Sequence, residues 1–200
     1  MRLPSLLLVA LLAAPVSAAP ARKAPPTLPI RGSAAETIAS LPPELAGWRR
    51  GETTDFSARA GGPALGLAVE YRPPGGPGIA TIYAYDRGVP PQRDGLVAPV
   101  LEAEVAAARR ELGSLGTYRG YQVLGIGDGP VIAGADGRPA LRCDAALLAF
   151  ASGPQADAFT CLGVHRGRFL KLRLTLPAAK PGFSEAVLGG FAAALLAAAR

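Results

Sequence analysis

Residues 141–176 read LRCDAALLAFASGPQADAFTCLGVHRGRFLKLRLTL, and this stretch decides the fold. Three strand-like segments alternate in it with two short turns. The strand-like segments are 141–150, 158–165 and 168–176. The first turn, 152–155, has the composition Ser-Gly-Pro-Gln, and the second consists of Arg166 and Gly167. Because turns this short join neighbouring antiparallel strands, the stretch predicts two consecutive hairpins.

The two-residue turn also sets the register of the second hairpin. His165 is expected to pair with Arg168, so that Cys161 lies opposite Leu172. Side chains alternate between the two faces of a strand, which gathers apolar residues on one face. These residues are Phe159, Cys161, Leu170, Leu172, Leu174 and Leu176. We expect this face to belong to the hydrophobic core.

The opposite face of the same strands gathers polar side chains. They are Arg142, Asp144, Thr160, Lys171 and Arg173. In the expected register Asp144, Thr160 and Arg173 form one row across the sheet. One interpretation is a solvent-exposed face stabilised by cross-strand charge pairs. The other is a face that binds an anion or a partner protein, and these five residues are then the candidate binding site.

The two cysteines of the chain, Cys143 and Cys161, lie in the first of these hairpins. They are symmetric about Ser152, so a hairpin turning there places them opposite one another. Opposed residues have Cα atoms roughly 4.5–5.5 Å apart, which a disulfide spans. We therefore predict a disulfide, with two buried free thiols as the alternative. A zinc site is disfavoured because His165 is the only histidine.

Further strands are expected upstream of this stretch. Segments 65–71 and 79–86 alternate or are rich in β-branched and aromatic residues, and a loop rich in proline and glycine joins them into a hairpin. A weaker strand is expected at 53–57. Another is expected at 118–126, and the glycine cluster 125–129 predicts a plain turn at its end, because no lysine or helix follows as a phosphate-binding loop requires.

Two main helices complete the pattern. Apolar residues in 97–112 recur at helical spacing, with Pro99 suited to the first turn and Gly113 to the end. Residues 183–199 carry a large apolar residue at every fourth position, in a segment too short and too rich in alanine for a membrane helix. The sequence therefore predicts an α+β fold, in which an antiparallel sheet of about six or seven strands packs against two helices. Residues 36–200 are expected to form this single domain.

The N-terminal residues predict export. Residues 1–18 have the three parts of a signal peptide: Arg2, a short apolar core at 6–14, and small residues at 16–18. The apolar core is shorter than a membrane-spanning helix requires, and no cysteine follows it for lipid attachment. Residues 19–35 are rich in proline and predict a disordered linker. We expect a soluble periplasmic or secreted protein with no stable membrane insertion.

Charge and motifs exclude several classes of function. The net charge of +6 is scattered along the chain, a pattern that does not favour nucleic-acid binding. His165 lies next to a tight turn, and the chain has no Gly-x-Ser-x-Gly nucleophile elbow. Glu102, Glu104 and Glu111 are interleaved with arginines, which is typical of a solvated helix surface. We therefore predict no catalytic residue, no metal site and no cofactor.

Three segments carry a resemblance to known proteins. They are Gly47-Trp48-Arg49-Arg50, the sequence GLAVEY at 66–71 and the sequence ATIYAYD at 80–86. With the helix that follows, they resemble an uncharacterised family of exported bacterial proteins. The order of strands and helices also resembles the PsbP-like α/β sandwich, whose members bind partners in photosynthetic membranes. The resemblance implies the fold but no activity, because nothing here matches the functional residues of that group.

These observations favour a non-enzymatic periplasmic interaction or binding module, whose partner is a periplasmic protein or a small ligand. One alternative is a small-ligand carrier, which an apolar pocket with converging polar groups between sheet and helices would favour. A second alternative is a hydrolase whose site assembles from loops. A buried His165, hydrogen-bonded to a carboxylate and facing a hydroxyl, would favour the hydrolase.

Overall fold

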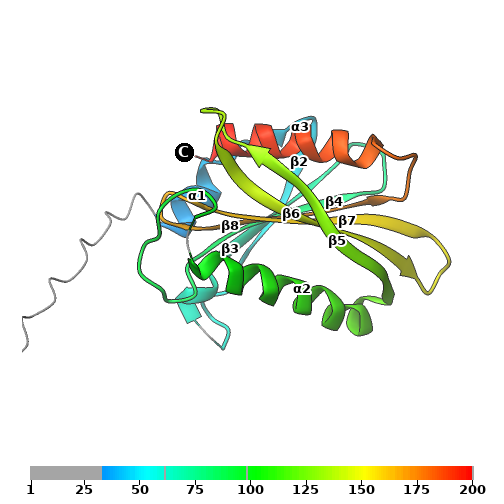
Figure 1. Cartoon of the computed structure of the whole chain (residues 1–200), viewed down its shortest axis with the longest axis horizontal. Coiled ribbons are helices and arrows are strands. Elements are labelled where there is room, and N and C mark those ends of the chain that lie inside the picture. The colour runs from blue at the N-terminus through cyan, green and yellow to red at the C-terminus, as the bar shows by residue number, and fades with distance from the viewer. Residues whose placement is uncertain (1–32, 61, 98, 200) are drawn as a thin grey trace, which may run out of the picture.

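In the computed structural model, an antiparallel sheet forms the centre of the protein and helices cover both of its faces (Figure 1). The structure describes residues 33–60, 62–97 and 99–199. The elements in this part of the chain are α1 (Ala34–Ser40), β1 (Glu44–Leu45), β2 (Trp48–Asp55), the 3-10 helix η1 (Gly62–Leu65), β3 (Leu67–Arg72), β4 (Ile79–Tyr85), α2 (Pro99–Arg119), β5 (Tyr121–Ala133), β6 (Pro139–Phe150), β7 (Gln155–His165), β8 (Arg168–Pro177) and α3 (Phe183–Ala198). The strand order is β1-β2-β3-β4-β8-β7-β6-β5, and every neighbouring pair is antiparallel.

The α+β class is confirmed, but the described residues hold eight strands and three α-helices rather than six or seven strands and two helices. The additional strand is β1, a two-residue edge strand, and the weak strand expected at 53–57 is part of the longer β2. The additional helix is α1. Its capping box begins at Ser33, whose hydroxyl accepts from the Glu36 amide at 3.1 Å. The expected signal peptide 1–18 lies outside the described residues, as does the expected linker up to residue 32.

The two hairpins of residues 141–176 form in the predicted register. Cys143 pairs with Cys161, and His165 pairs with Arg168. Arg166 and Gly167 have φ angles of 55° and 83°. Positive values at both positions are typical of a type I′ turn, whose twist matches that of the flanking strands. The cysteines form the predicted disulfide, with Cα atoms 3.9 Å apart. This part of the fold follows directly from turn length and alternation.

The segment between the two halves of the sheet differs from expectation. Helix α2 runs through Gly113 to Arg119, so the expected end was wrong by about two turns. The strand expected at 118–126 is β5, which starts at Tyr121 and contains the whole glycine cluster, so the expected turn there was also wrong. Tertiary packing outweighs the poor helix propensity of glycine here. A Cβ at Gly116 would lie 2.5 Å from the Tyr121 carbonyl oxygen, so glycine lets the helix and β5 approach closely.

The main hydrophobic core lies between the sheet and the helices α1 and α3. The alternating leucines of β8 line it, as predicted, together with the disulfide and Phe159. Phe191 of α3 packs edge-on against Trp48 and Tyr71, with ring centroids 5.4 and 5.9 Å apart. The apolar face of these strands is therefore the core face, as the register predicted.

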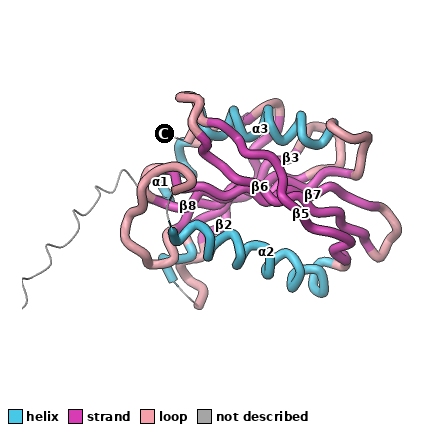
Figure 2. Tube along the Cα trace, viewed as in Figure 1, coloured by secondary structure: helices cyan, strands magenta, loops and turns pink. Residues whose placement is uncertain are grey.

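Helix α2 covers the other face of the sheet, on the side opposite α3 (Figures 1 and 2). Two smaller apolar clusters hold it there. Leu101 and Val105 pack with Phe169 near the start of the helix, and Leu112 packs with Leu148 further along. The result is a helix–sheet–helix arrangement of three layers. Within the described ranges, no helix combines the length and the apolar character needed to cross a bilayer.

Candidate functional site

The five polar residues singled out in the sequence lie beneath α2. Asp144, Thr160 and Arg173 form the predicted row, because Thr160 pairs with Asp144 on one side and with Arg173 on the other. Asp144, Thr160 and Lys171 are only 5%, 6% and 4% exposed. The interpretation of this face as solvent-exposed was therefore wrong. Its alternation is as expected, but the sequence did not indicate that α2 lies on this side.

Asp144 anchors the middle of α2 to the sheet. The Arg109 guanidinium donates from Nε and Nη2 to the two Asp144 carboxylate oxygens, at 2.7 and 2.6 Å. Nη2 also donates to exposed Asp128 of β5 at 2.7 Å. These hydrogen bonds and the two negative charges raise the pKa of Arg109. Asp144 is thus occupied by a residue of the chain itself.

Two more of the five residues are also held by α2. Arg142 donates to Glu102 at 2.8 Å in an ion pair near the surface. Lys171 donates to Glu111 at 3.1 Å in a far less exposed pair. Glu102 is exposed, as expected for a solvated helix surface, whereas Glu111 is half-buried against the sheet. Glu104 departs furthest from that expectation, because it is 6% exposed.

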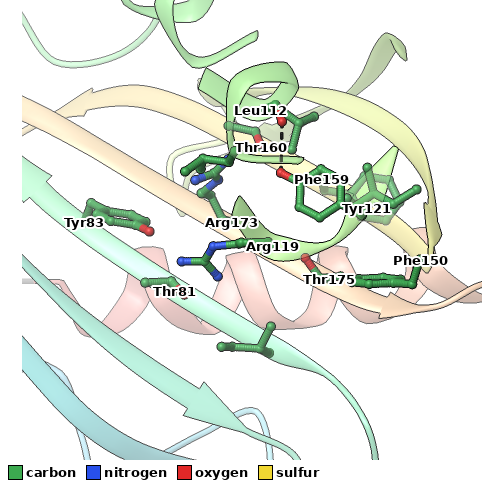
Figure 3. A pocket seen from close by; sticks show the side chains of 14 residues that line it. Thr81, Tyr83, Leu112, Arg119, Tyr121, Phe150, Phe159, Thr160, Arg173 and Thr175 are labelled. Atoms are coloured by element: carbon green, nitrogen blue, oxygen red, sulfur yellow. Dashed lines mark hydrogen bonds between the residues drawn. The ribbon is translucent and has the colours of Figure 1, made fainter. Parts of the chain in front are cut away.

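The remaining two residues, Thr160 and Arg173, line a cavity of about 380 Å³ between the C-terminal half of α2 and the sheet. Arg119, from the last turn of α2, lines it as well. Figure 3 shows the side chains of both arginines projecting into this space. The Tyr121 hydroxyl donates to the Leu112 carbonyl at 2.9 Å across the cavity wall, and Figure 3 marks this bond with a dashed line.

The two arginines are the cations of this cavity. Neither forms a salt bridge with a carboxylate anywhere in the described chain. Burial raises the pKa of Tyr121, and the positive charges of Arg173 and Arg119 oppose that rise, so both guanidinium groups lie near the same phenol. Arg173 is half-buried and Arg119 is exposed. The lining of the cavity therefore carries two positive charges, one of them on an exposed side chain in the last turn of α2.

The rest of the lining divides into hydroxyl and apolar side chains. The hydroxyl groups belong to Thr81, Tyr83, Tyr121, Thr160 and Thr175. The apolar side chains belong to Ile79, Leu112, Leu115, Leu148, Phe150 and Ala158. Phe159 also borders the cavity, although its side chain packs in the main core on the other face of the sheet. Small-molecule sites in proteins occupy roughly 300–1,000 Å³ and combine apolar walls with a few converging polar groups. The cavity beneath α2 has both properties.

His165 does not belong to this cavity. Its Nε2 contacts the backbone carbonyl of Ala199, which follows the last turn of α3. A backbone carbonyl is not the carboxylate that orients the histidine of a hydrolase triad. The described residues also contain no group of three or more histidine, cysteine, aspartate or glutamate side chains placed to hold a metal ion.

Apart from Thr160 and Arg173, the residues that line the cavity were not part of the site predicted from the sequence. Arg119 falls in a strand predicted from the sequence, but in the structure it is the last residue of α2. Thr81 and Thr175 were placed on the correct strands, but their position depends on the pairing of β4 with β8, in which Thr81 lies opposite Arg173. The alternation of side chains along a strand could have placed Thr175 in the site, because residues 171, 173 and 175 share one face of β8.

Comparisons with known proteins do not place the chain in a family. No model of a known protein family matches the chain. No curated protein matches it either. Function therefore has to be inferred from the site itself, which is the level at which function resides.

Proposed function

We propose that this chain is an exported binding module, and that the cavity beneath α2 binds a small ligand with an anionic group and an apolar part. The observation that carries the proposal is the pair of arginines, Arg119 and Arg173, which line one cavity and form no salt bridge in the described chain. The charge of Glu111 acts on Arg173, but this carboxylate is already paired with Lys171. The disulfide supports the exported location, because such bonds persist in oxidising compartments.

An anion is the ligand chemistry that this wall favours. Guanidinium groups bind phosphate, sulfonate and carboxylate groups through paired, charge-assisted hydrogen bonds. The hydroxyls of Thr81, Thr160 and Thr175 line the same cavity and can donate further hydrogen bonds. Because Arg173 is half-buried, its field is screened less than that of a surface arginine.

The apolar wall sets the second requirement. Leu112 and Leu115 approach from the helix, whereas Phe150 and Leu148 approach from β6. Removing an apolar part of the ligand from water is worth about 25 cal/mol per Å² of buried surface. An amphipathic anion therefore matches the lining better than a fully polar one. The volume suits a molecule of small-ligand size.

The lining favours binding over hydrolysis. General acid–base catalysis near neutral pH uses histidine most often, and aspartate or glutamate more readily than a tyrosine, whose pKa burial raises further at Tyr121. The described residues that line the cavity include threonine, tyrosine and arginine side chains, but no histidine or carboxylate. This composition supports a carrier or sensor of the ligand rather than the loop-assembled hydrolase.

Fluorescence titration with 1-anilinonaphthalene-8-sulfonate, an aromatic sulfonate, tests the proposal. Replacing Arg119 and Arg173 with glutamine removes both positive charges of the cavity. A hydrogen bond to a charged group contributes about 1.5–3 kcal/mol. We therefore expect the double variant to bind the probe at least ~10-fold more weakly.

A charge-matched control separates the cavity from the general surface charge. Arg110→Gln and Arg138→Gln remove two exposed arginines outside the cavity. This control is expected to bind the probe with unchanged affinity. Near-ultraviolet circular dichroism checks that each variant is folded. If the folded Arg119 and Arg173 double variant binds the probe as tightly as the wild type does, the proposal is contradicted.

A further inference from the structure

A second cavity, of about 180 Å³, lies beside the first, and Tyr83 lines both. Lys171 of β8 lines this second cavity, with its side chain only 5% exposed. The Nζ atom donates to Glu111 Oε2 at 3.1 Å. It also lies 4.6 Å from the ring centroid of Tyr83 and 5.4 Å from that of Tyr85. A primary amine is therefore held in one position at the wall of a cavity.

The environment favours the neutral, nucleophilic form of this amine more than a surface position would. Burial lowers the pKa of Lys171, and the nearby charge of Arg173 acts in the same direction. Glu111 opposes the shift but does not cancel it. An apolar residue in such a place often gives equal or greater stability than a buried ion pair. Stability alone therefore does not account for a lysine here, whereas desolvation next to a second cation is a known route to a reactive amine.

The cavity also carries positive charge that its own residues do not neutralise. Arg87 lines it and is paired with Glu104 at 2.9 Å. Arg59 lines it too, stacked over the Phe56 ring at 4.7 Å, and forms no salt bridge within the described residues. An incoming molecule with a negative group would find a partner in Arg59.

We propose that Lys171 is a reversible covalent binding site for small anionic carbonyl compounds, such as aldehydes or oxo acids that bear a carboxylate. The proposal does not rest on ligand binding in the larger cavity. Nζ attacks the carbonyl carbon, and a C–N bond forms. Nitrogen loses its two protons in succession to Glu111, which passes them to the former carbonyl oxygen. The C–O bond then breaks, and the oxygen leaves as water. The product is an imine at Lys171, so that amine and carbonyl give imine and water.

Reductive trapping with glyoxylate tests this site in the folded wild-type protein. Cyanoborohydride delivers hydride to the imine carbon and leaves a stable carboxymethyl group on the lysine. Lys180, which is exposed, provides an internal reference in the same sample. Peptide mass mapping over time at neutral pH gives the two rates. We expect trapping at Lys171 to be at least ~10-fold faster than at Lys180. Equal or slower trapping at Lys171 would overturn the proposal.

A variant tests the role assigned to Arg59. Because Arg59 is exposed, Arg59→Gln is expected to leave the fold intact. It should slow trapping of glyoxylate at Lys171 several-fold, while trapping of acetaldehyde, which has no charge, stays unchanged. An equal effect on both aldehydes, or on neither, would overturn the selectivity for anions.

Discussion

Arg109 and Asp144 form one ion pair between α2 and the sheet, but we expect removal of Arg109 to destabilise the protein more than removal of Asp144. Asp144 has a side chain only 5% exposed, whereas that of Arg109 is 40% exposed. Arg109→Met leaves a buried carboxylate without either of its hydrogen bonds, which costs about 3 kcal/mol or more. Asp144→Asn leaves Arg109 in contact with water and with Asp128, and the loss is about 1.5 kcal/mol. Arg109→Met should therefore be less stable than Asp144→Asn by about 1.5 kcal/mol.

Urea unfolding of the oxidised protein measures both costs. The matched control is Glu102→Gln, which breaks the ion pair between α2 and Arg142 of the same strand β6. That pair is largely exposed, and its loss is expected to cost less than about 1 kcal/mol. If Arg109→Met destabilises the protein no more than Glu102→Gln does, the buried anchor does not hold α2 on the sheet. If Asp144→Asn is the costlier of the two anchor variants, the assignment of the buried partner is wrong.

Three further predictions concern stability. Replacing Cys143 and Cys161 with alanine opens a cross-link over a sequence separation of 18, and we expect a loss of about 3 kcal/mol in urea unfolding. Gly116→Ala places a methyl group 2.5 Å from a backbone oxygen and should cost about 1–3 kcal/mol, whereas Gly113→Ala meets open space and should stabilise α2 slightly. Burial acts to raise the pKa of Glu111, but the charge and hydrogen bond of its partner Lys171 and the charges of nearby arginines together outweigh burial and lower the pKa below its ordinary value. The stability advantage of the wild type over Glu111→Gln should therefore be full above about pH 4.5 and shrink as the pH falls below it.

The final third of the chain could be predicted because its interactions are local in sequence. A turn of two residues leaves one register for the hairpin, and the symmetric spacing about Ser152 pairs Cys143 with Cys161. Alternation then divides the side chains of β8 between two faces. Register, disulfide and core face all follow from these short distances along the chain.

The cavity could not be predicted because its residues come together through long-range contacts. Arg119 reaches it only because α2 continues past Gly113, and that continuation depends on packing against β5. Thr81 reaches it only because β4 is the neighbour of β8. Alternation showed that Asp144 and Lys171 share a face, but the sequence pattern does not state which helix covers that face. Of the five residues in the candidate site, Thr160 and Arg173 line the cavity, and the other three hold the helix.

Locating a bound anion on the protein tests the central claim most directly. An amide chemical-shift titration of the folded protein with 1-anilinonaphthalene-8-sulfonate reports which residues meet the probe. Binding beneath α2 predicts that the largest shifts fall on Thr81, Thr160, Thr175 and Arg119, which line the cavity around Arg173. Shifts concentrated on α3 and the opposite face of the sheet, or no saturable shifts at all, would contradict the account.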